Sequence, residues 1–354
     1  MHNNIIWNNF GFGNAFPACL THHSNKGIPM IKTFAALASA LMLAAVATPA
    51  VRAADNYPSH PIRIVVAYPP GGSTDTAARL LADRLGTALK QTVVVENRPG
   101  AGGVIGASSV AKAQPDGYTL LFAASPELSI AGITTPNLPY DPNRDFAPIT
   151  MVGQVPFILV ANKDFPPNNV KELVAYAKAH PGKVNFSSFG ANTSNHLGGE
   201  LFNLRAGIKM THVPYRGSSP SLTDLMGGQV QVTFDTVTAV FPLIQSGKIK
   251  ALAIATAERS PLAPDLPTVA ESGVPGYTAG TWFGLLAPAG TPPEVVQRLS
   301  SATRAILESD DIRQQFASRG IQPSPGTPDA FRTFLAGEVA KWQDAAQKIG
   351  IKAN

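Results

Sequence analysis

Residues 62–89, IRIVVAYPPGGSTDTAARLLADRLGTAL, decide the fold. The apolar segment Ile62–Tyr68 predicts a strand, a Pro-Pro-Gly-Gly turn follows it, and the small polar residues from Ser73 onward predict the first turn of a helix. On that helix an alanine or leucine recurs every fourth residue from Ala77 to Leu89, which indicates a face packed on a sheet. The stretch therefore predicts a strand-turn-helix unit of an α/β protein.

The turn in this unit has the composition of an anion site. The first N–H groups of a helix have no intrahelical partner and lie at the positive end of the helix dipole, so a carboxylate or phosphate fits there without any lysine or arginine. Gly71 and Gly72 allow a close backbone approach, and Ser73 or Thr74 offers a hydroxyl or a helix cap. Asp75 would repel a bound anion, so we expect it to point away. An ordinary strand-to-helix turn explains this stretch alone equally well.

The first 53 residues predict a targeting segment. Lys32, an apolar run over residues 34–47 and the tripeptide Val51-Arg52-Ala53 match the three parts of a secretory signal, with cleavage after Ala53. Met30 lies at the right distance before Lys32 to be the translation start, which makes residues 1–29 an upstream extension. The run is too short for a membrane span and no lipid-attachment cysteine follows it, so we expect a soluble exported protein.

Composition excludes several classes of function. The single cysteine, Cys19, falls in the targeting segment, so we expect no disulfide and no thiol chemistry in the mature chain. Loss of Lys26, Lys32 and Arg52 lowers 28 basic residues to 25 against 23 acidic ones, and the net charge falls from +5 to +2. No cluster of lysine and arginine with interleaved aromatics appears, so nucleic-acid binding has no support.

Motifs for catalysis and metal binding are also missing. The sequence contains no GxSxG elbow, HExxH, P-loop or cysteine nucleophile, and no His-X-His or paired-cysteine spacing. GAGGVIG at 100–106 imitates a dinucleotide fingerprint, but Ile105 stands where its third glycine is required. We therefore expect no enzyme, no cofactor and no metal.

The mature length of about 300 residues predicts two domains of ordinary size. Strands and helices alternate, which favours a mainly parallel sheet in each domain. We expect the chain to cross between domains near Val155, and a strand at Trp282–Ala287 to return to the first sheet. The predicted lobes are residues 54–154 with 279–354, and residues 155–278, joined by a two-strand hinge with a cleft between them.

Ligands of parallel sheets bind beyond the carboxyl ends of the strands. Four loops occupy that position here: residues 68–75, 123–129, 187–194 and 235–238. The third loop, SSFGANTS, precedes a helix expected near Asn195 and repeats the small polar helix start of the first loop. Two helix N-termini that face each other across a cleft would hold one anion from both sides.

Each candidate residue in these loops has a structural alternative. Gly71, Gly72 and Gly190 serve either close approach to a ligand or turn geometry. Thr193 and Ser194 either donate to a carboxylate or cap their helix.

The remaining candidates are similarly divided. Asp235 either accepts a hydrogen bond from a ligand or caps the next segment, and Ser125 is equally suited to binding and to a turn. Tyr68 and Trp282 form an apolar wall or belong to the core. The full set of predicted ligand-binding residues is Tyr68, Gly71, Gly72, Ser73, Thr74, Ser125, Ser188, Gly190, Thr193, Ser194, Asp235 and Trp282.

A series of motifs in order gives the chain a family resemblance, beginning with Tyr57-Pro58 and Pro61-Ile62-Arg63 at the mature start. They include YPPGGSTDTAAR at 68–79, ENRPGAGGVIGA at 96–107, PDGYTLL at 115–121, NFSSFGANTSNHLGGELF at 185–202, HVPYRGSSPSLTDLMGGQV at 212–230, SGKIKALAIAT at 246–256, LPTVAESGVPGY at 266–277 and APAGTP at 287–292. In these the sequence resembles the Bug/TctC family, the periplasmic solute receptors of tripartite tricarboxylate transporters. The likeness covers nearly the whole mature chain.

The resemblance implies a type II periplasmic binding protein, a two-lobed Venus flytrap that closes on a small carboxylate partly through backbone amides and ordered water. It also implies a monomer in the periplasm that delivers its ligand to inner-membrane transporter subunits. One feature departs from the family, because Asn192 stands at the second glycine of the usual Gly-x-Gly in the third loop. Asparagine tolerates the left-handed conformation, so this departure affects the choice of ligand rather than the fold.

Two other classes of function remain open. An exported α/β enzyme acting on a carboxylate would turn its ligand over, whereas a receptor binds it stoichiometrically and leaves it unchanged. A ligand-sensing subunit of a signalling system would bind the same acid without delivering it to a permease. The sequence leaves the identity of the acid open among di- and tricarboxylates, aromatic acids and amino acids.

Overall fold

The strand-turn-helix unit of residues 62–89 forms as predicted in the computed structural model, which describes residues 57–260 and 263–351. Strand β1 covers Ile62–Val66 and helix α2 covers Ser73–Leu89. The α2 side chains that recur every fourth residue are buried against the sheet. The predicted targeting segment and the predicted start at Met30 lie outside the described residues.

The sheet begins with three parallel strands. β1 lies between β2 (Val93–Asn97) and β3 (Thr119–Ala124) and is parallel to both. β9 (Gly280–Pro288) is antiparallel to β3 and continues the order as β2-β1-β3-β9-β4. The predicted return of this segment to the first sheet is therefore confirmed, and it adds an antiparallel pair to the parallel strands.

A second set of parallel strands follows on the other side of β4 (Phe146–Asn162). β5 (Asn185–Ser188) lies between β6 (Thr211–Pro214) and β7 (Val232–Thr236) and is parallel to both. β7 and β8 (Ile249–Ile254) are each antiparallel to the second half of β4. Each lobe thus has the predicted parallel strands, completed by antiparallel pairing with β4.

The long strand β4 corrects one sequence prediction. Two shorter strands with a crossing near Val155 were expected, but β4 runs through this point as a single strand of 17 residues. Its middle pairs with β9, where Val155 lies opposite Thr281. Gly153 and Pro156 resemble strand breakers in the sequence, yet both pair with β9, opposite Phe283 and Gly280, after a register shift between Met151 and Gly153. β4 and β9 are the two strands that link the sheet halves, and the residue boundaries of the lobes remain a prediction.

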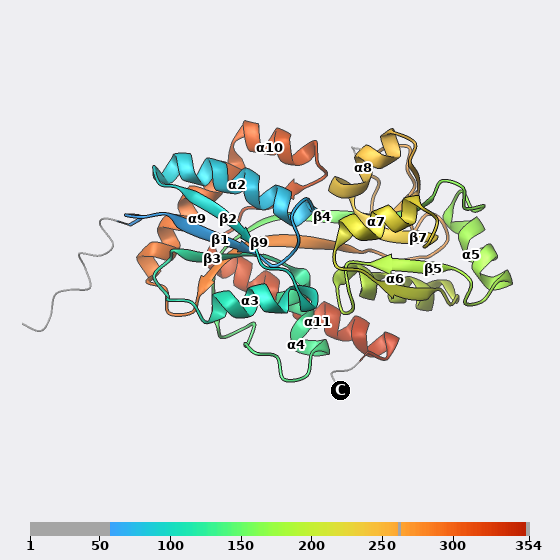
Figure 1. The fold of residues 1–354 in the computed structure, drawn as a ribbon, viewed down its shortest axis with the longest axis horizontal. Helices are drawn as coiled ribbons and strands as arrows, with labels where there is room; N and C mark the ends of the chain where they lie inside the picture. The colour runs from blue at the N-terminus through green and yellow to red at the C-terminus, as the bar shows by residue number, and fades with distance from the viewer. Residues whose placement is uncertain (1–56, 261–262, 352–354) are drawn as a thin grey trace, which may run out of the picture. The chain divides into compact units, whose positions relative to one another are not determined.

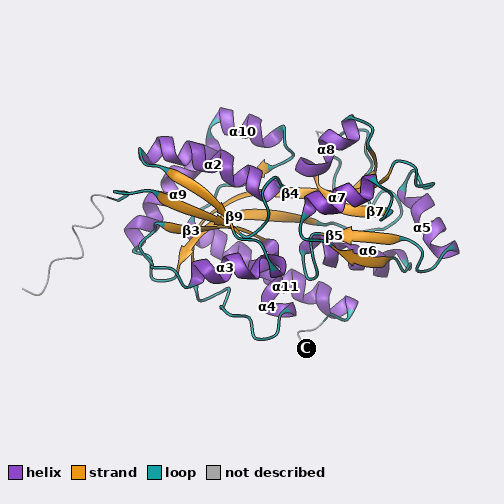
Figure 2. Ribbon diagram, viewed as in Figure 1, coloured by secondary structure: helices purple, strands orange, loops and turns teal. Residues whose placement is uncertain are grey.

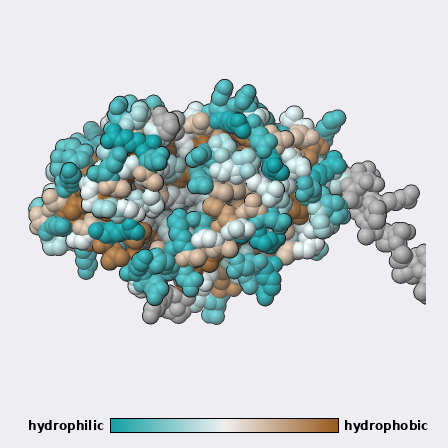
Figure 3. Space-filling view, turned by 180° about the vertical axis from the view of Figure 1, so that it is seen from behind, coloured by the Kyte–Doolittle hydropathy of each residue, from teal (hydrophilic) through white to brown (hydrophobic). Residues whose placement is uncertain are grey.

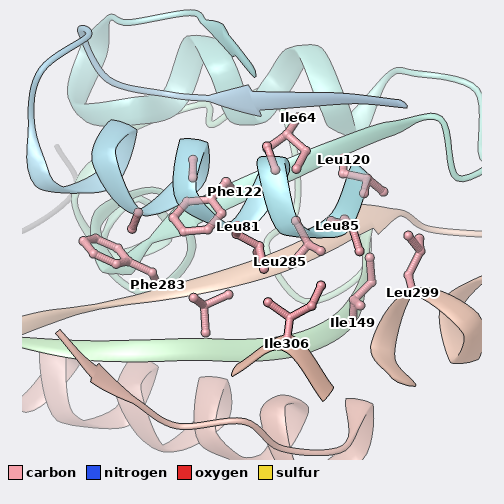
Figure 4. Packing of buried hydrophobic residues seen from close by; sticks show 14 of the residues in the cluster. Ile64, Leu81, Leu85, Leu120, Phe122, Ile149, Phe283, Leu285, Leu299 and Ile306 are labelled. Atoms are coloured by element: carbon pink, nitrogen blue, oxygen red, sulfur yellow. The ribbon is translucent and has the colours of Figure 1, made fainter. Parts of the chain in front are cut away.

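Helices cover both faces of each half of the sheet (Figures 1 and 2). One core lies between the sheet and α2, α9 and α10, and Figure 4 shows Leu81, Phe122 and Ile306 among its side chains. A second core lies on the opposite face, beneath α3 and α11. The other half of the sheet has two further cores, one involving α5 and α6 and one involving α7 and α8. The two-lobed α/β class is therefore as predicted.

The helical elements other than α2 are η1 (Ala101–Gly103), α3 (Val104–Ala111), η2 (Pro126–Ile130), α4 (Ala131–Thr134), α5 (Val170–Ala179), α6 (Ser194–Ala206), α7 (Ser218–Met226), α8 (Val237–Gln245), α9 (Pro293–Glu308), α10 (Asp310–Ala317) and α11 (Pro328–Ile349). The two-residue strand β10 (Gln322–Pro323) pairs with β4. Ser309 separates α9 from α10, and its side chain caps α10 by accepting from the Ile312 N–H.

Within residues 57–260 and 263–351 we find no helix that combines the length and the apolar character needed to cross a membrane. On the face shown in Figure 3, hydrophobic side chains occur in small patches interrupted by hydrophilic ones.

Candidate functional site

The first turns of four helices line one pocket, which we call the helix-end pocket. Helices α2, α6, α7 and α8 all begin at its wall, and each follows directly on a parallel strand or a short loop after one. Its volume is about 40 Å³. It is lined by Tyr68, Pro69, Pro70, Gly72, Ser73, Thr74, Ala124, Pro126, Phe189, Ser194, Arg216, Gly217, Ser218, Ser219, Pro220, Thr236 and Thr281.

The backbone N–H groups at these helix ends are available to a ligand. In none of the four helices does the N-cap side chain accept a hydrogen bond from a first-turn N–H. The same is true of α3 and α9. In α5, α10 and α11, by contrast, the N-cap side chain does accept such a bond. Among the described residues, the amides of Ser73, Thr74, Ser218 and Ser219 have no acceptor. Unpaired amides at the positive ends of several helices make the pocket attractive to an anion.

Three hydroxyls predicted to bind ligand also reach this pocket. Ser73, Thr74 and Ser194 line it, and within the described part of the chain their side-chain oxygens form no hydrogen bond. Tyr68 and Gly72 line it as well. The structure thus brings the two helix starts singled out in the sequence to a common pocket.

Asp75 faces away from this pocket and holds the first loop in place. Its carboxylate accepts the Gly71 N–H at 3.0 Å, the Asn97 side-chain amide at 2.8 Å and the Arg79 guanidinium at 2.9 and 3.0 Å. Burial raises the pKa of Asp75, but the hydrogen bonds from Arg79, Gly71 and Asn97 outweigh burial and leave this pKa below its ordinary value. The expectation that Asp75 is structural is confirmed, and the Gly71 amide serves this network.

Three other candidates use their side chains inside the protein. The Ser125 hydroxyl lies 2.8 Å from that of Thr281, so Ser125 sits behind a residue that lines the pocket. Ser188 Oγ donates to the Gly190 carbonyl at 2.8 Å, and Thr193 Oγ1 donates to the same carbonyl at 2.7 Å. These hydroxyls shape the loop before α6, and none of them lines the helix-end pocket.

Trp282 lies in a different place from the other candidates. Its ring packs edge-on against Phe331 and Phe334 of α11, with centroids 5.7 Å apart in both cases. It lines a separate cavity beside β4 and β9 rather than the pocket that contains Tyr68. The structure therefore does not form the predicted apolar wall of Tyr68 and Trp282, because the alternation of β9 turns Trp282 toward the core beneath α11.

A larger cavity of about 540 Å³ adjoins the helix-end pocket, and we call it the glycine-loop cavity. The two cavities share Tyr68, Pro69, Phe189, Arg216 and Gly217 as lining residues. The other lining residues of the glycine-loop cavity are Ala67, Pro99, Gly100, Ala101, Gly102, Gly103, Gly190, Ala191 and Tyr215. Gly190, one of the predicted residues, therefore lies at this second cavity.

Sequence reasoning missed the loop before α7. Arg216 and Gly217 line both cavities, and Ser218 and Ser219 form the first turn of α7 at the helix-end pocket. The prediction that no cationic side chain reaches the anion site is wrong, because Arg216 does. The missed pattern, Gly-Ser-Ser-Pro after β6, has the same small polar residues as the other helix starts.

Two buried carboxyl groups stand behind the pocket wall. Glu127 accepts the Tyr68 hydroxyl at 2.7 Å and the Ala124 N–H at 2.7 Å. Asp235, which the sequence offered as a ligand contact, accepts the Ser218 hydroxyl at 2.7 Å and the Thr236 N–H at 2.7 Å. Burial raises the pKa of each carboxyl to about 7. Neither group has an ion-pair partner among the described residues.

Replacing Glu127 with glutamine is expected to change how stability depends on pH. Between its ordinary pKa near 4.5 and about 7, Glu127 binds a proton in the folded but not in the unfolded chain, so its contribution to stability is complete at low pH and is lost as the pH rises through 7. Glu127→Gln removes this loss. Between pH 5 and pH 8, the free energy of unfolding of the variant should therefore rise relative to that of the wild type by roughly 1–3 kcal/mol, as measured by thermal unfolding. A constant difference across that range contradicts a buried, titrating Glu127.

Two histidines beside the third loop have structural contacts. His196 and His212 stack with centroids 3.8 Å apart. His196 Nδ1 accepts the Asn192 N–H at 3.0 Å, and His212 Nε2 lies 2.6 Å from the Ser188 hydroxyl. Burial lowers the pKa of His196 to about 4 and that of His212 to about 3, so both rings are neutral at pH 7.

Loops from the two predicted lobes meet beside the cavities. Asn192 has a φ of +62°, so asparagine keeps the left-handed conformation, and its side-chain amide reaches the Thr134 carbonyl at 3.4 Å. On the other side, a Cβ placed on Gly217 would lie 3.3 Å from Cγ of Pro69. The first and third loops and the loop before α7 therefore form one site.

The chain is similar to known proteins along most of its length. Residues 77–351 match the family model TctC, described as tripartite tricarboxylate transporter family receptor. Protein BugT of Bordetella pertussis is 40% identical over 324 residues, which is 91% of this chain and 99% of BugT.

Solved structures give the same result. The R. palustris protein Rpa4515 with adipate has a TM-score of 0.83 at 37% identity and covers 84% of this chain and 100% of its own. MatC from Rhodopseudomonas palustris with bound malate has a TM-score of 0.78 at 34% identity, with 82% and 99% covered. By its sequence motifs, its two-lobed fold and these matches, the chain belongs to the TctC family of tripartite tricarboxylate transporter receptors.

Proposed function

We propose that this protein is a periplasmic receptor that captures a small organic carboxylate in the helix-end pocket and delivers it to the membrane subunits of a tripartite transporter. The observation that carries the proposal is the convergence of four helix N-termini, with unpaired amides, on one pocket. Related receptors were solved with adipate and with malate, which supports a carboxylate as the ligand.

The pocket suits a carboxylate for an electrostatic reason. Each helix end contributes a partial positive charge and donor groups that need no reorganisation when the anion arrives. Ser73, Thr74 and Ser194 add hydroxyl donors that no protein group occupies. The narrow volume of about 40 Å³ matches a carboxylate head group rather than a whole metabolite.

Closure of the lobes couples binding to delivery. Ser73 and Thr74 belong to the predicted first lobe, whereas Ser194, Ser218 and Ser219 belong to the predicted second. An anion held by both sets stabilises the arrangement in which the lobes meet, because only that arrangement offers all the donors at once. The transporter subunits would then recognise the closed form.

A catalytic role is the second class that the sequence left open, and the site offers little for it. Among the described residues, the Ser188 hydroxyl lies 2.6 Å from His212 Nε2, but Ser188 is fully buried and its hydroxyl is also bonded to the Gly190 carbonyl. We therefore propose a receptor that returns its ligand unchanged.

Binding of a carboxylate panel tests the proposal. We expect purified protein to be stabilised against heat by at least one of succinate, malate, glutarate, adipate, glutamate, butyrate, pentanoate, hexanoate and benzoate, and not by glucose. Isothermal titration should then give one ligand per chain, and mass spectrometry should recover the acid unchanged after prolonged incubation. Stabilisation by glucose alone, or consumption of the acid, contradicts the proposal.

A further inference from the structure

Arg216 is the cation of the site. It lies between β6 and α7, its side chain is exposed, and it lines both the helix-end pocket and the glycine-loop cavity. No other lysine or arginine among the described residues lines either cavity. Arg79 and Arg98, which flank the neighbouring loops, are each paired with a carboxylate, whereas Arg216 has no hydrogen-bond or ion-pair partner in the described part of the chain.

The walls around Arg216 leave its charge uncompensated. Within the part of the chain that the structure describes, no aspartate or glutamate lines either cavity. The two acidic residues behind the wall, Glu127 and Asp235, are occupied by the Tyr68 and Ser218 hydroxyls and by backbone amides. An unpaired guanidinium attracts an anionic group that comes within about 4 Å, both in water and near a protein surface.

The relative size of the two cavities indicates which part of a ligand meets Arg216. A pocket of about 40 Å³ accommodates one carboxylate head group at the helix ends, and the rest of the ligand must extend into the adjoining cavity of about 540 Å³. Arg216 stands on the wall that the two share. The head group already has the amides of the helix ends as donors, so the guanidinium is the donor left for a second group.

We propose that Arg216 determines specificity by pairing with a second anionic group of the ligand, so that the receptor selects dicarboxylates over monocarboxylates of the same length. This inference rests on the proposed function and specifies its ligand class. A guanidinium presents two parallel N–H donors that match both oxygens of a carboxylate, which a lysine does not. A monocarboxylate would leave this donor pair unused and would place an apolar end beside a charge.

Matched acid pairs measure the contribution of Arg216. The affinities of succinate and butyrate, glutarate and pentanoate, and adipate and hexanoate are measured by isothermal titration for the wild type, Arg216→Gln and Arg216→Lys. We expect the wild type to bind the best dicarboxylate at least tenfold more tightly than its partner. Arg216→Gln should bind that dicarboxylate at least tenfold more weakly than the wild type does, whereas its affinity for the monocarboxylate should stay within twofold of the wild-type value. The affinity of Arg216→Lys for the dicarboxylate should lie between those of the wild type and Arg216→Gln.

A charge-matched control excludes a long-range effect. Arg205→Gln removes the same charge from α6, where Arg205 donates to the Pro275 carbonyl and lines neither cavity, so its affinities should equal those of the wild type. The inference is overturned if Arg216→Gln loses the same affinity for both acids of a pair, or loses affinity for neither. Either result leaves the proposed receptor function intact. A wild type that binds none of the acids overturns the proposed function itself.

Discussion

Gly217→Val is expected to weaken carboxylate binding by about 100-fold. Gly217 lies in the loop before α7 and lines both cavities. A Cβ there would already lie 3.3 Å from Cγ and 3.4 Å from Cδ of Pro69, which belongs to the loop before α2. The valine methyl groups would extend beyond that position, so the two loops could not approach each other as closely. Overpacking of this kind costs roughly 1–3 kcal/mol, and it acts on the closed arrangement that binds ligand.

Gly273→Val is the matched control for this substitution. Gly217 and Gly273 have φ values of +112° and +109°, so a side chain strains the backbone similarly at both. A Cβ on Gly273, however, meets only Cγ of Lys171 at 4.0 Å. Both variants should lose similar thermal stability, and only Gly217→Val should lose affinity in isothermal titration. If Gly273→Val loses as much affinity, backbone strain rather than contact with Pro69 explains the effect.

Asp75→Ala is expected to lower the free energy of unfolding by about 2–4 kcal/mol and to weaken ligand binding with it. The substitution leaves the Gly71 N–H without its acceptor and removes the ion-pair partner of Arg79. It also takes one of two acceptors from the Asn97 side-chain amide, which keeps the Tyr68 carbonyl. The loop from Tyr68 to Gly72 is then held less firmly, because the Gly71 contact anchors it. Chemical denaturation and ligand titration of the same preparation measure both effects.

Asp83→Ala provides the comparison on the same helix. Asp83 is an exposed residue of α2 that pairs with its neighbour Arg84, so its loss should change stability by less than about 0.5 kcal/mol. The pKa of Asp75 is lowered in the folded chain, so its contribution is present above its ordinary pKa and is lost as the pH falls through the folded value. The difference in free energy of unfolding between the wild type and Asp75→Ala should therefore become smaller at acid pH. A gap that stays constant down to the acid limit of the fold argues against a charged Asp75.

Sequence pattern was sufficient for most of the fold. The apolar residues at every fourth position of α2 and the alternation of strand and helix patterns predicted elements that differ from the structure mainly at their ends. The continuity of β4 through Val155 was not predicted, because two separate strands were expected on either side of the crossing. What keeps β4 continuous there is its pairing with β9, a contact between residues more than 120 positions apart that no local pattern contains.

The site was predicted in part, for a related reason. Helix starts that follow a strand were visible as Gly-Gly-Ser-Thr before α2 and as Thr-Ser before α6. The loop after β6 was not among the four predicted ligand loops, so Ser218, Ser219 and the preceding Arg216 were overlooked. Glu127 was missed because its importance arises from burial against Tyr68, which only the folded chain brings about. Trp282 was included because the alternation of side chains along β9 does not show which face of the sheet Trp282 lies on until the neighbouring strands and helices are known.

A crystal structure of the protein with the panel acid that stabilises it most tests the central claim directly. We predict one carboxylate of that acid in the helix-end pocket, with its oxygens about 3 Å from backbone N–H groups of Ser73 or Thr74 and of Ser218 or Ser219. A carboxylate bound elsewhere, such as in the cavity beside Trp282, or bound by the loop of one lobe alone, would contradict the account.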